Sequence, residues 1–134
     1  MINICIIPAR GGSKRIPKKN IKIFLGKPII NYVIKAAKIS KIFNYIIVST
    51  DDKKIANIAK KKGVLIHKRK KSLSKDNVGT TDVILDIIKT KKFNFKEPYK
   101  ICCIYPTSVF CTSKLLKKAN TMLTNKTEYI FSAV

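Results

Sequence analysis

Residues 4–20 read ICIIPARGGSKRIPKKN. The first four, Ile4–Ile7, form a continuous apolar run that ends at Pro8, the pattern of a strand buried on both faces of a parallel sheet. The loop that follows, Pro8–Asn20, holds two glycines, a serine and five cations. A buried strand that leads directly into such a loop is typical of α/β proteins, which bind ligands beyond the carboxyl ends of their strands.

Strand-like and helix-like segments alternate along the rest of the chain. Besides 4–7, short apolar runs predict strands at 45–48, 64–66, 101–105 and 129–131. Apolar residues at helical spacing predict helices from Pro28 to about Ile39, from Asp51 or Asp52 to Gly63, from Thr80 or Thr81 through Ile88, and from Thr112 or Ser113 to Leu123. The alternation predicts an α/β fold with a mostly parallel sheet and helices on both faces.

Length and composition predict one globular domain over residues 1–134, since 46% of the chain is hydrophobic. No apolar run approaches the roughly 18–20 residues that cross a bilayer, so we expect no membrane partner. No charged and apolar leader precedes the first strand, and we expect a cytoplasmic protein. Val134 directly follows the expected fifth strand, which predicts a fold that is incomplete at the C-terminus, through truncation or dependence on another subunit.

The formal net charge of +22 raises the alternative of a basic nucleic-acid-binding module. Only Arg10, Arg15 and Arg69 among the 29 basic residues are arginine, and the lysines are spread over nearly every polar segment. Base recognition and bidentate phosphate contacts favour arginine. We therefore expect no specific nucleic-acid partner, and a positive field that attracts an anionic small molecule such as a nucleoside triphosphate.

The four cysteines, Cys5, Cys102, Cys103 and Cys111, do not have the spacing of a zinc site. Three of them lie in apolar strand-like runs, where free cysteine behaves as a small hydrophobic residue. We expect reduced core residues without a catalytic role.

The loop after the first strand is the candidate phosphate-binding segment. Glycines let the backbone approach phosphate oxygens closely, and Arg10, Lys14 and Lys19 carry charges that can neutralise a polyphosphate. The loop matches neither G-x-x-x-x-G-K-[ST] nor a dinucleotide G-x-G pattern. On composition alone, a flexible basic turn between strand and helix is an equal alternative.

The order of residues resembles the signature loop of the CMP-sugar synthetase (acylneuraminate cytidylyltransferase) family. The first block is IPARGGSK at 7–14 followed by IPKKN at 16–20. Later blocks are GKPII at 26–30, IVSTDD at 47–52 and CCIYPTS at 102–108, and the last is most similar to pseudaminic acid cytidylyltransferases. The resemblance implies a Rossmann-like fold of the nucleotide-diphospho-sugar transferase type and one nucleotide-binding domain over residues 1–134.

The resemblance also implies site residues for CTP. Ala9, Arg10, Gly11, Gly12 and Ser13 would wrap the triphosphate, and Arg10, Lys14 and Lys19 would be the catalytic cations. Asn20 would position the nucleotide, Arg69 and Thr80 would lie near the cytidine, and Ser49, Thr50 and Asp51 would line the base pocket. From the residues alone, the alternative for Arg69 is one more surface cation, and the alternative for Thr80 and Asp51 is a plain helix cap.

The implied sugar is a nine-carbon acid of the pseudaminic or related sialic type, used for cell-surface glycans. Tyr105 stands where the sialic acid enzymes have a glutamine that touches the sugar, and we expect Tyr105, Thr107 and Ser108 to face this substrate. The alternative for Tyr105 is packing at a strand end. The family resemblance also implies Mg²⁺, with its aspartate ligands beyond Val134, and a homodimer, so we expect weak CTP binding and little turnover from this chain alone. Other nucleotide-sugar transferases and an inactive fragment are further alternatives.

Overall fold

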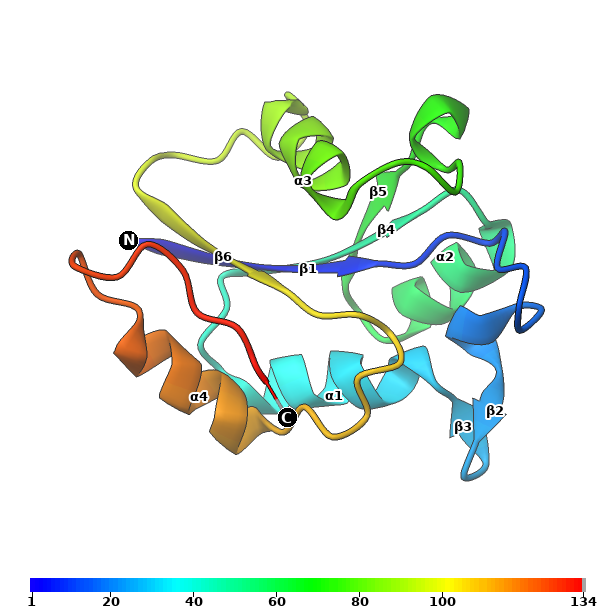
Figure 1. Cartoon of the computed structure of the whole chain (residues 1–134), viewed down its shortest axis with the longest axis horizontal. Coiled ribbons are helices and arrows are strands. Elements are labelled where there is room, and N and C mark those ends of the chain that lie inside the picture. The colour runs from blue at the N-terminus through cyan, green and yellow to red at the C-terminus, as the bar shows by residue number, and fades with distance from the viewer. Residues whose placement is uncertain (134) are drawn as a thin grey trace.

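A computed structural model describes residues 1–133 and contains a four-stranded sheet in which all neighbouring strands are parallel. The strand order is β5 (Leu65–Lys68), β4 (Tyr45–Thr50), β1 (Ile2–Pro8), β6 (Tyr99–Cys103). Strand β1 is central, with Ile6 beside Ile47 of β4 on one side and Cys103 of β6 on the other (Figure 1). The predicted parallel sheet is confirmed.

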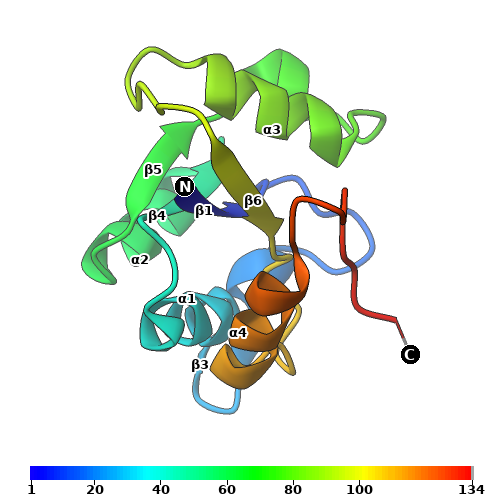
Figure 2. The same cartoon turned by 90° about the vertical axis from the view of Figure 1, so that its left-hand side faces the viewer.

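Helices cover both faces of this sheet, as the alternation predicts. One face carries α1 (Ile30–Ser40), α2 (Lys53–Lys61) and α4 (Ser113–Met122), and the opposite face carries α3 (Thr80–Lys89) (Figure 2). The α3 face is the thinner one, because a single helix and the segment before β6 cover it.

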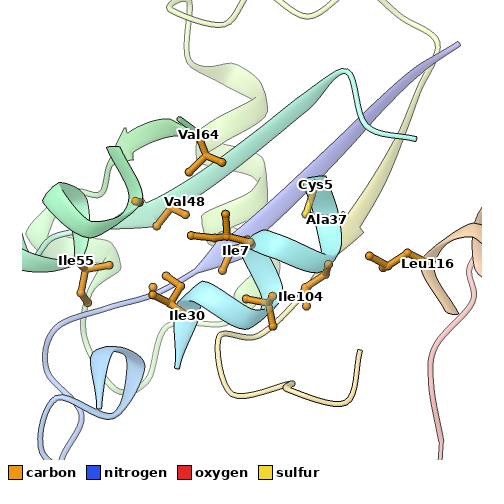
Figure 3. Packing of buried hydrophobic residues seen from close by; sticks show 13 residues of the cluster. Cys5, Ile7, Ile30, Ala37, Val48, Ile55, Val64, Ile104 and Leu116 are labelled. Atoms are coloured by element: carbon orange, nitrogen blue, oxygen red, sulfur yellow. The ribbon is translucent and has the colours of Figure 1, made fainter. Parts of the chain in front are cut away.

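Strand β1 supplies side chains to both apolar layers, since successive residues of a strand point to opposite faces. Cys5 and Ile7 pack with Ile30 and Ile55 in the layer that faces α1 and α2 (Figure 3). Ile4 and Ile6 pack with Val83 and Ile87 of α3 on the other side. Each fully buried isoleucine contributes roughly 1.5–3 kcal/mol, so the run 4–7 anchors the fold.

The predicted helix boundaries hold at several positions. The side chain of Asp52 accepts a hydrogen bond from the amide of Ile55 (2.9 Å) at the start of α2, and Thr112 accepts one from Leu115 (3.3 Å) at the start of α4. Gly63 follows α2 with φ +69°, a left-handed conformation in which glycine carries no steric penalty.

Two helix starts differ from the prediction. Pro28 does not open α1, because it lies in β3 (Lys27–Pro28), which pairs antiparallel with β2 (Ile23–Phe24). The helix begins two residues later at Ile30. Thr80 is the first residue of α3, not its cap, and the capping position belongs to Gly79.

The expected fifth strand at 129–131 is wrong, because these residues lie outside any strand. Tyr129 and Phe131 are 72% and 74% exposed, and the sheet ends at β6. An apolar run becomes a strand only where a neighbouring strand receives its hydrogen bonds, and none does so here. Within residues 1–133, no helix is both long and apolar enough to cross a bilayer.

Candidate functional site

The sheet has a topological switch point beside β1. The chain leaves β1 through α1 toward β4, whereas β6 reaches the other side of β1 from α3 on the opposite face. Connections that diverge in this way open a crevice at the carboxyl ends of the strands. A cleft of about 260 Å³ lies there. Its lining includes Arg10, Lys19, Asn20, Arg69, Thr80, Tyr105 and Thr107 of the predicted site residues, together with Lys75 and Asp76.

The loop after β1 is tied down by its own polar groups. The side chain of Asn20 is 6% exposed and donates to the carbonyl oxygen of Arg10 (2.9 Å). The hydroxyl of Ser13 accepts from the amide of Lys19 (2.9 Å). Through these bonds the loop folds back on itself so that Arg10, Lys19 and Asn20 meet at the cleft. These bonds favour an ordered loop over the alternative of a flexible turn.

Gly11 is required by close packing against the start of α2. A Cβ at this position would lie 2.8 Å from Cβ of Asp52 and 2.9 Å from its Oδ2. The amide of Gly11 donates to the carboxylate of Asp51 (2.9 Å). Gly12 has no atom within 4 Å of an added Cβ. The two glycines thus have different roles, and Asp51 holds the loop while Asp52 caps the helix.

Arg10 and Lys14 both contact Asp76, which lies in the segment between β5 and α3. Nη1 of Arg10 pairs with one carboxylate oxygen, and Nζ of Lys14 pairs with the other. The hydrogen bonds from Lys14 and then Arg10 lower the pKa of Asp76 below its usual value. The carboxylate therefore stays ionised next to two of the cations that sequence analysis assigns to phosphate. Sequence analysis missed Asp76, because no motif links it to a loop 66 residues earlier.

Arg69 follows β5 and is only 7% exposed, which excludes the surface-cation alternative. Its Nε donates to the hydroxyl of Ser49 (3.2 Å) and its Nη2 to the carbonyl oxygen of Ser49 (3.0 Å). Burial lowers the pKa of Arg69, the neighbouring Asp51 raises it and Arg10 lowers it. A guanidinium remains protonated under such shifts, so a buried positive charge faces the cleft.

The opposite wall of the cleft is formed by the end of β6 and the start of α3. The hydroxyls of Tyr105 and Thr80 are hydrogen-bonded at 2.8 Å. Tyr105 is 53% exposed, so its ring is available to a ligand and not packed into the core. Thr107 lines the same cleft.

The remaining predicted residues do not line the cleft. These are Ala9, Gly11, Gly12, Ser13, Lys14, Ser49, Thr50, Asp51 and Ser108. Ala9 is buried and its amide donates to the carbonyl oxygen of Ser49 (2.8 Å). Ser108 is half-buried in the turn after β6, where its amide donates to Tyr105 (3.0 Å). Ser49 and Thr50 are buried, and the Ser49 hydroxyl accepts a hydrogen bond from Arg69, which lines the cleft.

The described cysteines are not activated thiols. Cys5 is completely buried, and burial raises its pKa well above the usual value. Burial also raises the pKa of Cys102 to about 12. Cys103 is exposed, contrary to its expected place in the core. Within residues 1–133, no three His, Cys, Asp or Glu side chains are grouped as a metal site.

Sequence comparison relates this chain to enzymes of one type. Residues 4–134 match a family model described as Cytidylyltransferase. A pseudaminic acid cytidylyltransferase from Campylobacter jejuni is 41% identical over 99% of this chain and 58% of its own length. An N-acylneuraminate cytidylyltransferase A from Danio rerio is 39% identical over 96% of this chain and 29% of its own. The chain thus spans little more than half of the first relative.

Solved structures share the fold. A CMP:2-keto-3-deoxy-manno-octonic acid synthetase complexed with CTP superposes with a TM-score of 0.73 at 20% identity, over 91% of this chain and 47% of the other. A cytidylyltransferase from Leptospira borgpetersenii gives a TM-score of 0.69 at 24% identity, over 92% and 49% of the two chains. These similarities support the Rossmann-like fold predicted from the signature loop.

Proposed function

This chain belongs to the cytidylyltransferase family, and on that premise we propose that its cleft binds CTP for transfer of CMP to a nine-carbon acidic sugar. One observation carries the proposal: Arg10, Lys19 and the buried Arg69 converge on a cleft at the carboxyl ends of the strands, at the switch point beside β1. Lys75 adds a fourth cation to the lining. A nucleoside triphosphate is an anion of the size and charge that such a site attracts.

The proposed reaction needs charge stabilisation and alignment more than a covalent nucleophile. The anomeric hydroxyl of the sugar attacks the α-phosphorus of CTP and forms a new P–O bond. The bond from this phosphorus to the bridging oxygen breaks, pyrophosphate leaves with the electron pair, and the hydroxyl proton passes to solvent. Arg10, Lys14 and Lys19 would stabilise the charge on the phosphates, and Asn20 would hold the loop that carries Arg10.

Asp76 gives the cation pair a partner before the nucleotide arrives. Its carboxylate pairs with Arg10 and Lys14 in the free protein and offsets one of their two positive charges. A triphosphate offers these cations more negative charge than one carboxylate does, so binding would exchange Asp76 for phosphate oxygens. Asp76 is 44% exposed and can turn toward solvent when it is displaced.

The wall formed by Tyr105 and Thr107 is the proposed sugar-facing side. The Campylobacter relative is named for pseudaminic acid, and we assign the same class of sugar, or a related sialic acid, to this chain. The exposed ring of Tyr105 can pack on the apolar face of a sugar while its hydroxyl stays bonded to Thr80. We also carry forward the homodimer as a proposal from the family.

Magnesium is expected for the family, but the described residues do not form a site for it. Mg²⁺ binds through carboxylates and phosphate oxygens. In the free protein Asp76 is paired with two cations, Asp51 accepts from Gly11 and Asp52 caps α2. No three His, Cys, Asp or Glu side chains in the described part of the chain are grouped so that they could hold a metal ion. The residues present therefore do not fit the metal, and the steps proposed for this chain depend on its cations.

A nucleotide panel tests the proposal. A ligand that binds only the folded protein raises the melting temperature, and at equal concentration the tighter ligand raises it more. We expect CTP to stabilise the protein more than UTP, ATP or GTP at equal concentration, and CMP to stabilise it less than CTP. Differential scanning fluorimetry measures this. Equal shifts in melting temperature with all four triphosphates would indicate a site for polyanions in general. No shift with any of them would contradict the proposal.

A further inference from the structure

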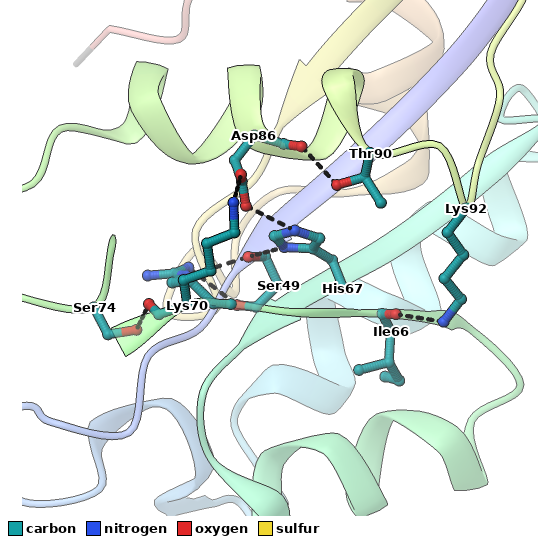
Figure 4. A network of polar contacts seen from close by, with 9 residues as sticks. Ser49, Ile66, His67, Lys70, Ser74, Asp86, Thr90 and Lys92 are labelled. Atoms are coloured by element: carbon teal, nitrogen blue, oxygen red, sulfur yellow. Dashed lines mark hydrogen bonds and ion pairs between the residues drawn. The ribbon is translucent and has the colours of Figure 1, made fainter. Parts of the chain in front are cut away.

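A series of hydrogen-bonded side chains connects Arg69 to α3, and Figure 4 shows its members Ser49, His67 and Asp86. The hydroxyl of Ser49 lies 3.2 Å from Nε of Arg69 and 2.9 Å from Nδ1 of His67. Nε2 of His67 lies 3.1 Å from Oδ2 of Asp86 on α3. The series thus joins β4, β5, the segment after β5 and α3, and it ends at a side chain that lines the cleft.

The direction of each bond follows from the two charged ends of this series. A guanidinium only donates, so the Ser49 oxygen accepts from Nε of Arg69. An ionised carboxylate only accepts, so Nε2 of His67 carries a proton and donates it to Asp86. In the neutral ring Nδ1 is then an acceptor, and the Ser49 hydroxyl donates to it.

Burial keeps this arrangement dry and the ring neutral. Ser49, His67 and Arg69 are 0%, 5% and 7% exposed. Burial is the largest effect on His67 and lowers its pKa. Asp86 from α3 raises that pKa, and Arg69 and Lys70 from the segment after β5 lower it.

These hydrogen bonds do not involve Nη1 of the Arg69 guanidinium. Nε and Nη2 of Arg69 are both bonded to Ser49, and Nη1 has no protein acceptor among residues 1–133. Because two donors are fixed on one residue, the plane of the guanidinium is fixed as well, and Nη1 is the donor left for a ligand in the cleft.

We propose that His67 and Asp86 are positioning residues that act through Ser49 to hold the Arg69 guanidinium in the orientation that meets the nucleotide. The proposal rests on the proposed function of the cleft, and it adds two residues that do not touch the cleft themselves. Lys70 pairs with the other oxygen of Asp86 at 3.1 Å, is 70% exposed and forms no hydrogen bond with His67 or Ser49 of the described chain.

The ring nitrogen of His67 that carries the proton can be identified directly, because His67 is the only histidine in the chain. In ¹⁵N NMR of histidine-labelled protein at pH 7.5, we expect the neutral ring with its proton on Nε2. A proton on Nδ1, or a charged ring at this pH, would overturn the proposal. This measurement needs no nucleotide, so it remains decisive if CTP does not bind.

Variants of His67 and Asp86 then test whether these hydrogen bonds hold the Arg69 side chain. We expect His67→Phe and Asp86→Leu to accelerate hydrogen exchange of the Arg69 Nε proton and to weaken CTP binding about tenfold, since each breaks a bond behind a charged donor. Asp86→Asn keeps an acceptor for Nε2 and should restore both properties to within about threefold of the original protein. Lys89→Ala, which removes an exposed charge from the end of α3, is the matched control and should change neither.

Circular dichroism establishes that each variant is folded, and Asp86→Asn keeps the test valid if Asp86→Leu unfolds. Unchanged Arg69 exchange in folded His67→Phe would overturn the positioning role. Loss of CTP affinity without a change at Arg69 would also overturn it. If the original protein fails to bind CTP, the proposed function falls, and the exchange of the Arg69 proton still decides whether His67 and Asp86 hold this side chain.

Discussion

At the scale of single residues, residues of the same type have different structural roles. Gly11 and Gly12 both belong to the glycine pair of the signature loop, but only Gly11 packs against Asp52. Arg69 is one of 29 basic residues, yet its burial and its two bonds to Ser49 separate it from the surface lysines. Composition cannot make either distinction, because it depends on contacts with distant parts of the chain.

The two glycines give a matched prediction. Gly11→Ala places a methyl group 2.8 Å from Cβ of Asp52, so the loop or the start of α2 must shift, and we expect a loss of about 1–3 kcal/mol in the free energy of unfolding. Gly12→Ala has open space and should change that free energy by less than about 0.5 kcal/mol. Urea titration followed by circular dichroism measures both. Equal effects of the two substitutions would contradict the packing role of Gly11.

At the scale of elements, the sequence predicts what depends on local periodicity. The strands β1, β4, β5 and β6 and the four helices follow from apolar spacing, and Asp52 and Thr112 cap where expected. The hairpin of β2 and β3 has two-residue strands, which are too short to show a periodic apolar pattern. The sequence therefore predicts Pro28 in the following helix and not in β3. The segment 129–131 shows the opposite error, since its apolar run has no strand to pair with.

The candidate site also has one part that the sequence predicts and one part that it does not. Residues close to one another in the signature loop could be predicted from the sequence, because the loop itself brings them together. The pair of Arg10 with Asp76 spans 66 residues, and the bond between Ser49 and His67 spans 18. Such contacts depend on the order of the strands and on the placement of α3, which apolar periodicity does not specify.

The contact between β5 and α3 makes stability depend on pH. His67 is buried with a pKa lowered from 6.5, so below about pH 6.5 the unfolded chain binds a proton that the folded chain does not. The free energy of unfolding should fall as the pH is lowered through 6.5 toward the lowered pKa, by at most about 1.4 kcal/mol per pH unit from this group. The slope from His67 should vanish about one unit above pH 6.5. Urea titrations at pH 8, 7, 6 and 5 measure this. His67→Gln should be less sensitive, and an identical slope in that variant would contradict the assignment.

At the scale of the whole molecule, the net charge of +22 acts on both stability and binding. Like charges repel in the compact state, and this repulsion weakens as salt shortens its range. We expect 0.5 M NaCl to raise the melting temperature of the free protein by about 3–5 °C, as a gain of about 1 kcal/mol would. The same salt should weaken CTP binding, since attraction to an anion is screened too. A melting temperature that falls with NaCl would contradict this account.

The central claim is that the cations beside β1 hold the phosphates of a cytidine nucleotide, and isothermal titration of CTP into Arg10→Ala tests it most directly. The matched control is Lys117→Ala, which removes an exposed charge from α4. The account predicts that Arg10→Ala weakens CTP binding at least about tenfold, as expected for loss of a charge-assisted contact, while the control stays within about twofold. Unchanged CTP affinity in folded Arg10→Ala would contradict it.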